Sequence, residues 1–557
     1  MRPSIAVRED GTPVVSWEES GPLWGKDYSY LLGTRATSLY QDRRIRLAFL
    51  DNGQWSALAA DPVEAVHPDQ RRFVQQPQVA WDASGRLHLL FRVRTSAGTA
   101  RIDHWASGGR WETFHTSLDG DMWRPASLLP SSVGRNSMRA AMVLNGDQVH
   151  LAWPTDNRGW PPPGRYGDLE VYATRLAATG AASKLVRAPW PTAANVDNPH
   201  PNENEDTARI RGHRITIGGK EYRIVRGDLH RHTELSPDGA GDGSLEDLYR
   251  YALDAAAMDY AHVSDHQMGA DEDYNWWITQ KSNDLYFMPR RFVPLYGYER
   301  SVPYPNGHRN VIWAERGKQV LRINSAEQKG TVNTGSVLYP YLKDTGGVAT
   351  SHTSATEQGT DWRDNDPALE PIVEIYQGFE SNYETAGAPR AWKEGDKAVH
   401  QGVRPAGYVW NAWAKGYKLG VQASSDHVST HTSYACILVE DFTRKGILDA
   451  IRKRHTYAAT DSIVLEFRIN DNALMGDIVT TEGSPKIAVK AYGTAPIKQI
   501  ELIRNNTYIY KMAASGREAS FEYVDAADRP AQAWYYVRLE QADGQLAWSS
   551  PIWVGKR

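Results

Sequence analysis

Between residues 221 and 464 the sequence alternates strand-like apolar stretches with segments of helical periodicity. Strand-like runs lie at 260–264, 292–299, 308–314, 347–351, 371–377 and 418–424. Helices are expected after a Ser-capped, acidic start at 243–247, and near 336–343, 408–416 and 443–453. Alternation of this length predicts a parallel α/β architecture, either a barrel or an open sheet.

Residues 1–190 have the pattern of an all-β domain. Apolar runs at 13–17, 87–91 and 149–153 each follow a turn and recur about 60 to 75 residues apart. Groups of about four strands at that period are typical of propeller blades, and SLDGDMW at 117–123 resembles a degenerate Asp-box turn. About three blades can be counted, whereas a closed propeller usually needs at least four. We predict a propeller-like domain, with a β-sandwich of similar size as the alternative.

The remaining segments complete the predicted domain organisation. Residues 191–220 are rich in Pro, Asn and Asp and have the composition of a linker. Residues 465–557 hold about seven short strands between Gly, Asn and Asp turns, which fits an immunoglobulin-like β-sandwich. The predicted domains are therefore 1–190, 191–220, 221–464 and 465–557.

Charge and hydropathy exclude two classes of partner. The 557 residues carry a net charge of −4 with no long basic run, whereas a protein that neutralises nucleic-acid phosphates normally has a basic excess. No stretch reaches about 18 consecutive apolar residues, so neither a transmembrane helix nor a membrane partner is expected. The first residues lack the charged and apolar segments of a signal peptide. The β-rich flanks and 20 tryptophans still favour a periplasmic or secreted location.

A single cysteine, Cys436, excludes an intrachain disulfide framework and a thiolate-rich zinc site. Any metal must therefore bind to histidines and carboxylates. Nine of the 17 histidines fall between residues 228 and 431, in the segment of strand–helix alternation. The candidate ligands are His230, His232, Asp238, His266, Glu299, His308, His352, Asp426 and His427, with His431 as an alternative last histidine.

Most of these candidates follow predicted strands, where active sites collect in α/β barrels. His230 and His232 are two residues apart on a strand, so both side chains can reach one ion. A lone histidine is more often a surface or core residue, but so many at strand ends in one domain jointly predict metal binding. His262, at the centre of its strand, fits a supporting or core role better than a ligand role.

The ordered motifs resemble the PHP (polymerase and histidinol phosphatase) superfamily. They are DLHRHTELSPDG at 228–239, SDH at 264–266, a strand-end glutamate, two isolated histidines and a final Asp/His pair. VEIYQG, SSDHVSTHTSYA and RKRHTYAATD further resemble the carbamate-hydrolase-like branch and its large members. The resemblance covers about residues 224–465. It implies a distorted seven-stranded β/α barrel with two or three divalent ions at its mouth, flanked here by β domains.

The resemblance also implies how the ligands divide among the ions. One ion would be held by His230, His232, Glu299 and Asp426. Glu299 would bridge to a second ion held by His308 and His352, and Asp238, His266 and the last histidine would hold a third. The family usually ends in Asp-x-His, whereas here His427 directly follows Asp426, so either His427 or His431 completes the set.

Such a site suits hydrolysis of a small-molecule ester by a metal-activated hydroxide. The ions would be manganese, zinc or iron, because nitrogen and oxygen ligands do not choose among them. Arg309 could hold a phosphoryl oxygen, with a structural salt bridge as the alternative. His427 or His431 could protonate the leaving group. We expect a phosphoesterase for mono- or diesters. The alternatives are a carbamate or carboxylic ester hydrolase, and a non-catalytic glycan-binding protein with structural metals.

Overall fold

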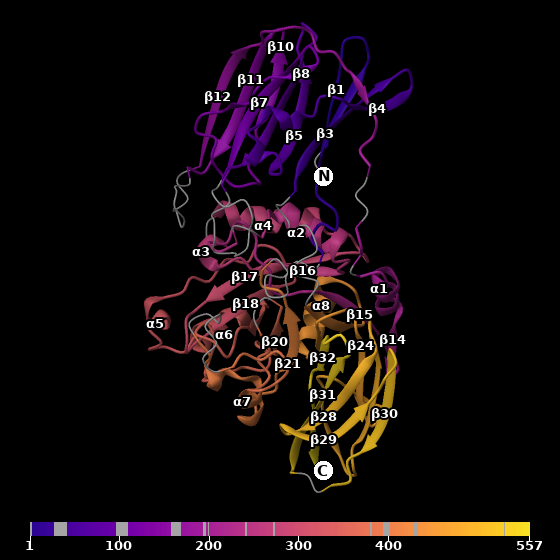
Figure 1. Cartoon of the computed structure of the whole chain (residues 1–557). Coiled ribbons are helices and arrows are strands. Elements are labelled where there is room, and N and C mark those ends of the chain that lie inside the picture. Colours follow the sequence, from indigo (N-terminus) through magenta and orange to yellow (C-terminus); the bar gives the residue numbers. More distant parts are fainter. Residues whose placement is uncertain are drawn as a thin grey trace. The chain divides into compact units, whose positions relative to one another are not determined.

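The computed structural model of this chain describes residues 3–26, 42–95, 110–157, 169–192, 196–198, 200–239, 242–270, 273–378, 381–393, 402–427, 433–527 and 530–556. The molecule is β-rich and multi-domain, with 42 % of residues in strands and 16 % in helices (Figure 1). It forms two compact units. The first comprises residues 1–26, 35–198 and 237–248, and the second comprises 27–34, 199–236 and 249–557.

The described part of the first unit contains three antiparallel sheets. The first is β1 (Ser4–Val7), β2 (Pro13–Glu19), β3 (Arg44–Asp51), β4 (Gln54–Leu58) and β13 (Arg187–Ala188). The second is β5 (Val74–Trp81), β6 (Leu87–Arg94), β7 (Trp111–Asp119), β8 (Met122–Trp123) and β9 (Ser127–Leu128). The third is β10 (Ala141–Asn145), β11 (Gln148–Thr155) and β12 (Glu170–Ala177). The strands expected at 13–17, 87–91 and 149–153 are confirmed, one in each sheet, while a propeller stays a prediction.

The second sheet contains a chain of hydrogen-bonded ionisable side chains. Asp82 Oδ2 lies 3.1 Å from His88 Nε2, and His88 Nδ1 lies 3.1 Å from His115 Nε2. Arg86 Nε also donates to Asp82 Oδ2, at 2.7 Å. Burial, with a smaller contribution from the adjacent His88, lowers the pKa of His115 to about 4. Burial likewise lowers the pKa of His88, although Asp82 opposes that shift. Both imidazoles are therefore neutral at neutral pH.

These depressed pKa values predict that acid destabilises the first unit. Unfolded His115 would titrate near its ordinary pKa of about 6.5, so the unfolded chain binds more protons than the folded chain below that pH. Stability from this group is complete above about pH 6.5 and falls by about 3 kcal/mol towards pH 4. Urea unfolding of the wild type and of His115→Gln, at about pH 7 and about pH 4.5, measures this effect. The variant should lose less stability on acidification; equal losses would contradict the explanation.

The second unit is built around one large mixed sheet. Its first part is β14 (Arg214–Ile217), β15 (Lys220–Asp228), β16 (Tyr260–His262), β17 (Val293–Ser301), β18 (His308–Trp313), β19 (Val348–Ser351), β20 (Ile372–Gln377), β21 (Gly420–Ser424), β22 (Tyr434–Val439) and β23 (Thr456–Ala459). Strands β15, β16 and β17 run parallel, as do β19, β20 and β21. Strand β18 is antiparallel to both neighbours, and β22 is antiparallel to β15. The α/β character is confirmed, and the seven-stranded barrel stays a prediction.

Helices connect these strands, and those at 245–250, 335–345, 409–414 and 444–452 lie where the sequence predicts them, whereas the other four described helices were not predicted. They are α1 (Glu203–Gly212), α2 (Leu245–Arg250), α3 (Gln267–Ala270), α4 (Asp273–Leu285), α5 (Ser325–Gln328), α6 (Gly335–Thr345), α7 (Val409–Ala414) and α8 (Arg444–Arg452). Helix α6 ends where Gly346 adopts a left-handed φ of 72°, which glycine tolerates without strain. Helix α1 and strand β14 lie within 191–220, the predicted linker. In the described part of the chain, no helix is long and apolar enough to cross a membrane.

The central strands are apolar because both of their faces are buried. Val293, Leu295 and Ile312 of β17 and β18 belong to one fully buried core. On the other face, Tyr298 and Val311 pack with residues of α6. Strands covered on both sides read as continuous apolar runs, which is why they were recognisable in the sequence. Polar side chains inside this sheet therefore need a specific partner.

The C-terminal residues form two further groups of strands. Strands β24 (Val464–Ile469), β25 (Ala473–Leu474), β27 (Lys486–Tyr492) and β30 (Glu518–Val524) make a separate four-stranded sheet. Strands β26 (Ile478–Thr481), β28 (Ile497–Arg504), β29 (Thr507–Ala513), β31 (Gln532–Gln541), β32 (Leu546–Ser549) and β33 (Ile552–Lys556) continue the large sheet from β23. Tyr510 of β29 packs on Phe521 and Tyr523 of β30, with ring centroids 4.9 and 5.0 Å apart. These ring contacts bring β29 of the large sheet against β30 of the four-stranded sheet.

Candidate metal centre

The strands of the second unit bring most of the predicted ligands into one buried cluster. His230 and His232 follow β15, His266 follows β16, and His352 follows β19. Glu299 lies within β17, and His308 begins β18. Asp426 and His427 follow β21. All of these residues are at most 8 % exposed, so the cluster is held by the fold and not by mobile surface chains.

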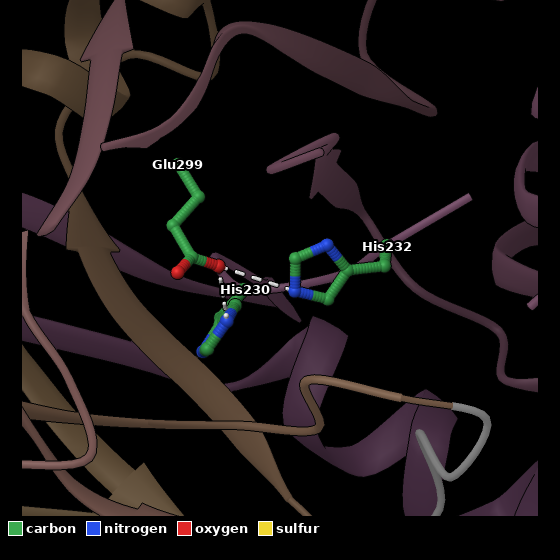
Figure 2. A group of neighbouring side chains, drawn as sticks. All are labelled: His230, His232 and Glu299. Carbon is green, nitrogen blue, oxygen red and sulfur yellow. Dashed lines mark hydrogen bonds and ion pairs between the residues drawn. The ribbon is translucent and has the colours of Figure 1, made fainter. Parts of the chain in front are cut away.

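One oxygen of Glu299 faces the first pair of histidines. Glu299 Oε2 lies 3.2 Å from Nε2 of His230 and 3.2 Å from Nε2 of His232 (Figure 2). Asp426 Oδ1 lies 3.1 Å and 2.9 Å from the same two nitrogens. Two imidazole nitrogens and two carboxylate oxygens therefore converge on one point. This is the donor set of a divalent transition-metal ion.

The second oxygen of Glu299 faces a different set of histidines. Glu299 Oε1 lies 2.6 Å from His308 Nδ1, 3.3 Å from His266 Nδ1 and 3.4 Å from His352 Nε2. Ser301 also contacts His266 Nδ1 through its hydroxyl group. The Glu299 carboxylate thus lies between two histidine sets, one on each oxygen. This arrangement fits a carboxylate shared by two ions.

Asp426 and His427 both face the cluster although they are adjacent in the chain. Neighbouring residues of a regular strand point in opposite directions. Asp426, however, has a left-handed φ of 62°, which turns the chain directly after β21. His427 Nε2 lies 3.3 Å from Asp426 Oδ1, and the His427 ring stacks on that of His232 at 4.6 Å. The backbone turn thereby brings His427 to the cluster, while His431 lies outside the described residues.

Buried atoms without hydrogen-bond partners test whether the cluster fits a metal. Within the described residues, His308 Nδ1, His352 Nε2 and Asp426 Oδ1 are buried and make no hydrogen bond of good geometry. Burial lowers the pKa of His308 to about 4 and also lowers that of His352, so both rings are neutral. Neutral imidazoles and carboxylates with free lone pairs are the forms that bind metal ions. The residues therefore fit the expected ions.

Electrostatics favour an ionised Glu299 in this buried position. Burial alone would raise its pKa, but the electrostatic interaction with His266 and His352, together with hydrogen bonds to His230 and His232, holds the pKa of Glu299 well below its ordinary value. A lone buried carboxylate would neutralise by taking up a proton. Glu299 instead keeps its negative charge at neutral pH, which a bridging ligand requires.

Glu374 of β20 is a candidate site residue that the sequence analysis missed. Its Oε2 atom lies 3.0 Å from His230 Nδ1, and the residue is fully buried. Together with His230 and His352 it forms one of the groups whose atoms could hold an ion. The available signal was a lone acid inside the apolar run Ile372–Gln377. An acid inside a fully buried strand needs a partner, and that pattern could have identified it.

Arg309 does not point towards the cluster. Its guanidinium group donates to Glu370 Oε2 at 3.0 Å and to Asp364 Oδ1 at 3.1 Å. His308 and Arg309 are adjacent on β18, so their side chains occupy opposite faces of the strand. The structure therefore shows the salt bridge that was the alternative to phosphoryl binding.

Asp238 is buried and lies in the segment 237–248 of the first unit. Its proposed place among the ligands stays a prediction.

His262 lies in the core beneath the cluster. Its Nδ1 and Nε2 atoms face the backbone oxygens of Leu229 and Val311 at 2.9 and 3.2 Å. Burial lowers its pKa to about 4. Both ring nitrogens are thus turned towards the backbone, as expected for a core histidine that is not a ligand.

Comparisons with known sequences identify distant relatives. No family model matches the chain. An uncharacterised protein of Chlamydia pneumoniae is 27 % identical over 372 residues, which cover 59 % of this chain and 57 % of that protein. An uncharacterised protein of Chlamydia muridarum is 25 % identical over 374 residues with the same coverage. The chain thus spans little more than half the length of these curated relatives.

Among solved structures, one neighbour is a two-domain protein of Bacteroides vulgatus described as containing a predicted PHP-like metal-dependent phosphoesterase. It has a TM-score of 0.34 and 11 % identity, and the match covers 60 % of this chain and 97 % of that one. A β-glucuronidase of Bacteroides uniformis follows with a TM-score of 0.16 and 11 % identity, covering 87 % and 61 %. At these scores neither likeness assigns a fold or an activity, so the functional argument depends on the residues of the cluster.

Proposed function

We propose that the chain is a metal-dependent hydrolase of small-molecule esters, acting on phosphoric mono- or diesters with two or three divalent ions. The observation that carries the proposal is the position of Glu299, whose two carboxylate oxygens face two separate histidine sets. His230, His232 and Asp426 would hold one ion, and His308 and His352 a second. Bound ions of this kind lower the pKa of water and neutralise charge on substrate oxygens.

The residues of the chain have separate tasks in this proposal. Glu299 stays ionised and holds the two ligand sets in one arrangement. The neutral rings of His308 and His352 offer lone pairs without needing to lose a proton first. His427 lies at the edge of the cluster, stacked on His232, where it could donate a proton to a leaving group. A phosphoryl group suits this site because its oxygens carry the charge that clustered cations stabilise.

A substrate panel tests the proposal. Nitrophenyl phosphate, bis-nitrophenyl phosphate, nitrophenyl acetate and an aryl carbamate would each be assayed with Mn²⁺, Zn²⁺ or Fe²⁺, and with EDTA. We expect metal-dependent hydrolysis of a phosphate ester, abolished by EDTA and by His230→Ala, because that histidine contacts both Glu299 and Asp426.

Other outcomes of the same panel would contradict the proposal in identifiable ways. Faster hydrolysis of the carbamate or the acetate would replace the phosphoesterase with the second type of hydrolase. Bound metal without any hydrolysis would favour a non-catalytic binding protein. Full activity of His230→Ala in the absence of metal would contradict a metal centre altogether.

A further inference from the structure

Strand β20 carries two polar residues whose spacing is unusual for a strand. Glu374 and Gln377 are three residues apart, so in a regular strand they would point to opposite faces. Here the pairing with β21 shifts, because Glu374 pairs with Gln422 whereas Tyr376 pairs with Ala423. The extra residue, Ile375, forms a β-bulge. Bulges re-aim side chains and are common beside active sites.

The bulge turns Glu374 and Gln377 to the same side of β20. The apolar residues around them, Val373, Ile375 and Tyr376, pack together in the core on the other side. Glu374 and Gln377 are both completely buried. Two buried polar side chains therefore point towards the metal cluster from a strand that would otherwise present only one of them.

Glu374 contacts the imidazole ring of His230 at Nδ1, the nitrogen that faces away from Glu299 and Asp426. Its Oε2 atom lies 3.0 Å from His230 Nδ1 and also accepts a hydrogen bond from the Ser424 hydroxyl group. When Nδ1 carries the proton and donates a hydrogen bond to Glu374, the lone pair of the neutral His230 ring is on Nε2. Nε2 is the atom that faces Glu299 and Asp426.

Gln377 makes the equivalent contact with the acidic ligand. Its Nε2 atom donates to Asp426 Oδ2 at 3.1 Å, while Tyr383 donates to Gln377 Oε1 at 3.4 Å. Asp426 Oδ1 makes no hydrogen bond of good geometry and faces His230 and His232. The hydrogen bond from Gln377 therefore holds Oδ2 of Asp426, while Oδ1 of the same carboxylate faces the two histidines.

We propose that Glu374 and Gln377 are positioning residues of the metal centre, and that the bulge in β20 exists to place both. Glu374 fixes the tautomer and ring orientation of His230, and Gln377 fixes the carboxylate of Asp426. Partners of this kind orient metal ligands and raise their affinity for the ion. The inference rests on the metal centre of the proposed function, but not on the identity of the ester.

The test is a titration of chelator-treated protein with Mn²⁺, followed by calorimetry, for the wild type, Glu374→Leu, Glu374→Gln and Gln377→Leu. We expect Glu374→Leu and Gln377→Leu to lower the affinity by about 10- to 100-fold with the number of ions unchanged. Glu374→Gln keeps an acceptor for His230 and should lie between Glu374→Leu and the wild type. For any variant that hydrolyses ester, kcat should fall while KM changes little, because the ions and not the substrate are misplaced.

Glu384→Gln is the matched control for removing a buried carboxylate. Glu384 is fully buried in the same unit, but it contacts Tyr536, Arg538 and Trp548 instead of the cluster. It should bind Mn²⁺ as the wild type does, even if its melting temperature falls. Circular dichroism of each variant checks the fold. If Glu374→Leu does not fold, the Mn²⁺ affinity of Gln377→Leu still tests the inference.

Wild-type affinity in both Glu374→Leu and Gln377→Leu would overturn the inference. So would the loss of one whole ion in Glu374→Leu, because Glu374 would then be a ligand itself. A wild-type chain that binds Mn²⁺ but hydrolyses no ester would contradict the proposed function alone. A wild-type chain that binds no Mn²⁺ would contradict both.

Discussion

Replacing Glu299 with glutamine should reduce ester hydrolysis at least about 10³-fold, because bound ions contribute several kcal/mol of transition-state stabilisation and each 1.4 kcal/mol is a factor of ten. Glu299 contacts five histidines through two oxygens. Glutamine has the same shape but no charge, and only one of its two terminal atoms accepts hydrogen bonds. It can therefore face one histidine set as a ligand, but not both. The measurement is kcat/KM on the best ester of the panel.

The control is the same substitution at an exposed position. Glu315 lies in the same unit, its side chain is 80 % exposed, and it pairs only weakly with Lys318 at 3.4 Å. Glu315→Gln should keep wild-type activity, since an exposed pair of this kind contributes at most about 1 kcal/mol to stability. Glu299→Gln with activity within tenfold of the wild type would show that the carboxylate does not bridge.

Replacing Gly297 with alanine should destabilise the second unit by about 3 kcal/mol or more, because a methyl group has no room there. A Cβ atom at this position would lie 2.0 Å from the Val311 carbonyl oxygen and 2.1 Å from His262 Nε2. The oxygen belongs to the neighbouring strand β18, so it cannot move without disturbing the ladder between β17 and β18. Glu299 is two residues further along β17, so metal affinity should fall as well. Thermal unfolding by calorimetry measures the first effect.

Gly483→Ala is the matched control for this substitution. A Cβ atom at Gly483 would meet nothing within 4 Å. Its melting temperature should stay within about 2 °C of the wild type, whereas Gly297→Ala should melt several degrees lower. Equal melting temperatures of the two variants would mean that β17 and β18 can separate at no cost, which the packing does not allow.

The central strands and the principal ligands could be predicted because their signals are local. A strand buried on both faces is a continuous apolar run, so β17, β20 and β21 were found within two residues of their ends. His230 and His232 could be paired from their spacing of two residues in an extended segment, although both lie just after the end of β15 and not within it. Strand β22, also an apolar run, was missed by the sequence analysis, which took the residues before it only as part of the final Asp/His motif.

Other features depend on contacts between distant segments and carry no local signal. The β-bulge that aims Gln377 at Asp426 is defined only by pairing between β20 and β21. The left-handed turn at Asp426, which brings His427 to the cluster, follows no glycine or asparagine in the sequence. The partner of Arg309 is Glu370, 61 residues away. A strand can be predicted from its own residues, whereas the direction in which one of its side chains points depends on contacts with other segments.

The central claim is that two histidine sets share Glu299 around at least two divalent ions. The most direct measurement is the metal content of the purified wild-type chain after saturation with Mn²⁺ and removal of free metal, by mass spectrometry. Glu299→Gln is measured beside it. The wild type should retain two or three ions per chain, and Glu299→Gln should retain fewer. A wild-type chain that retains none, or a Glu299→Gln variant that retains as many as the wild type, would contradict the claim.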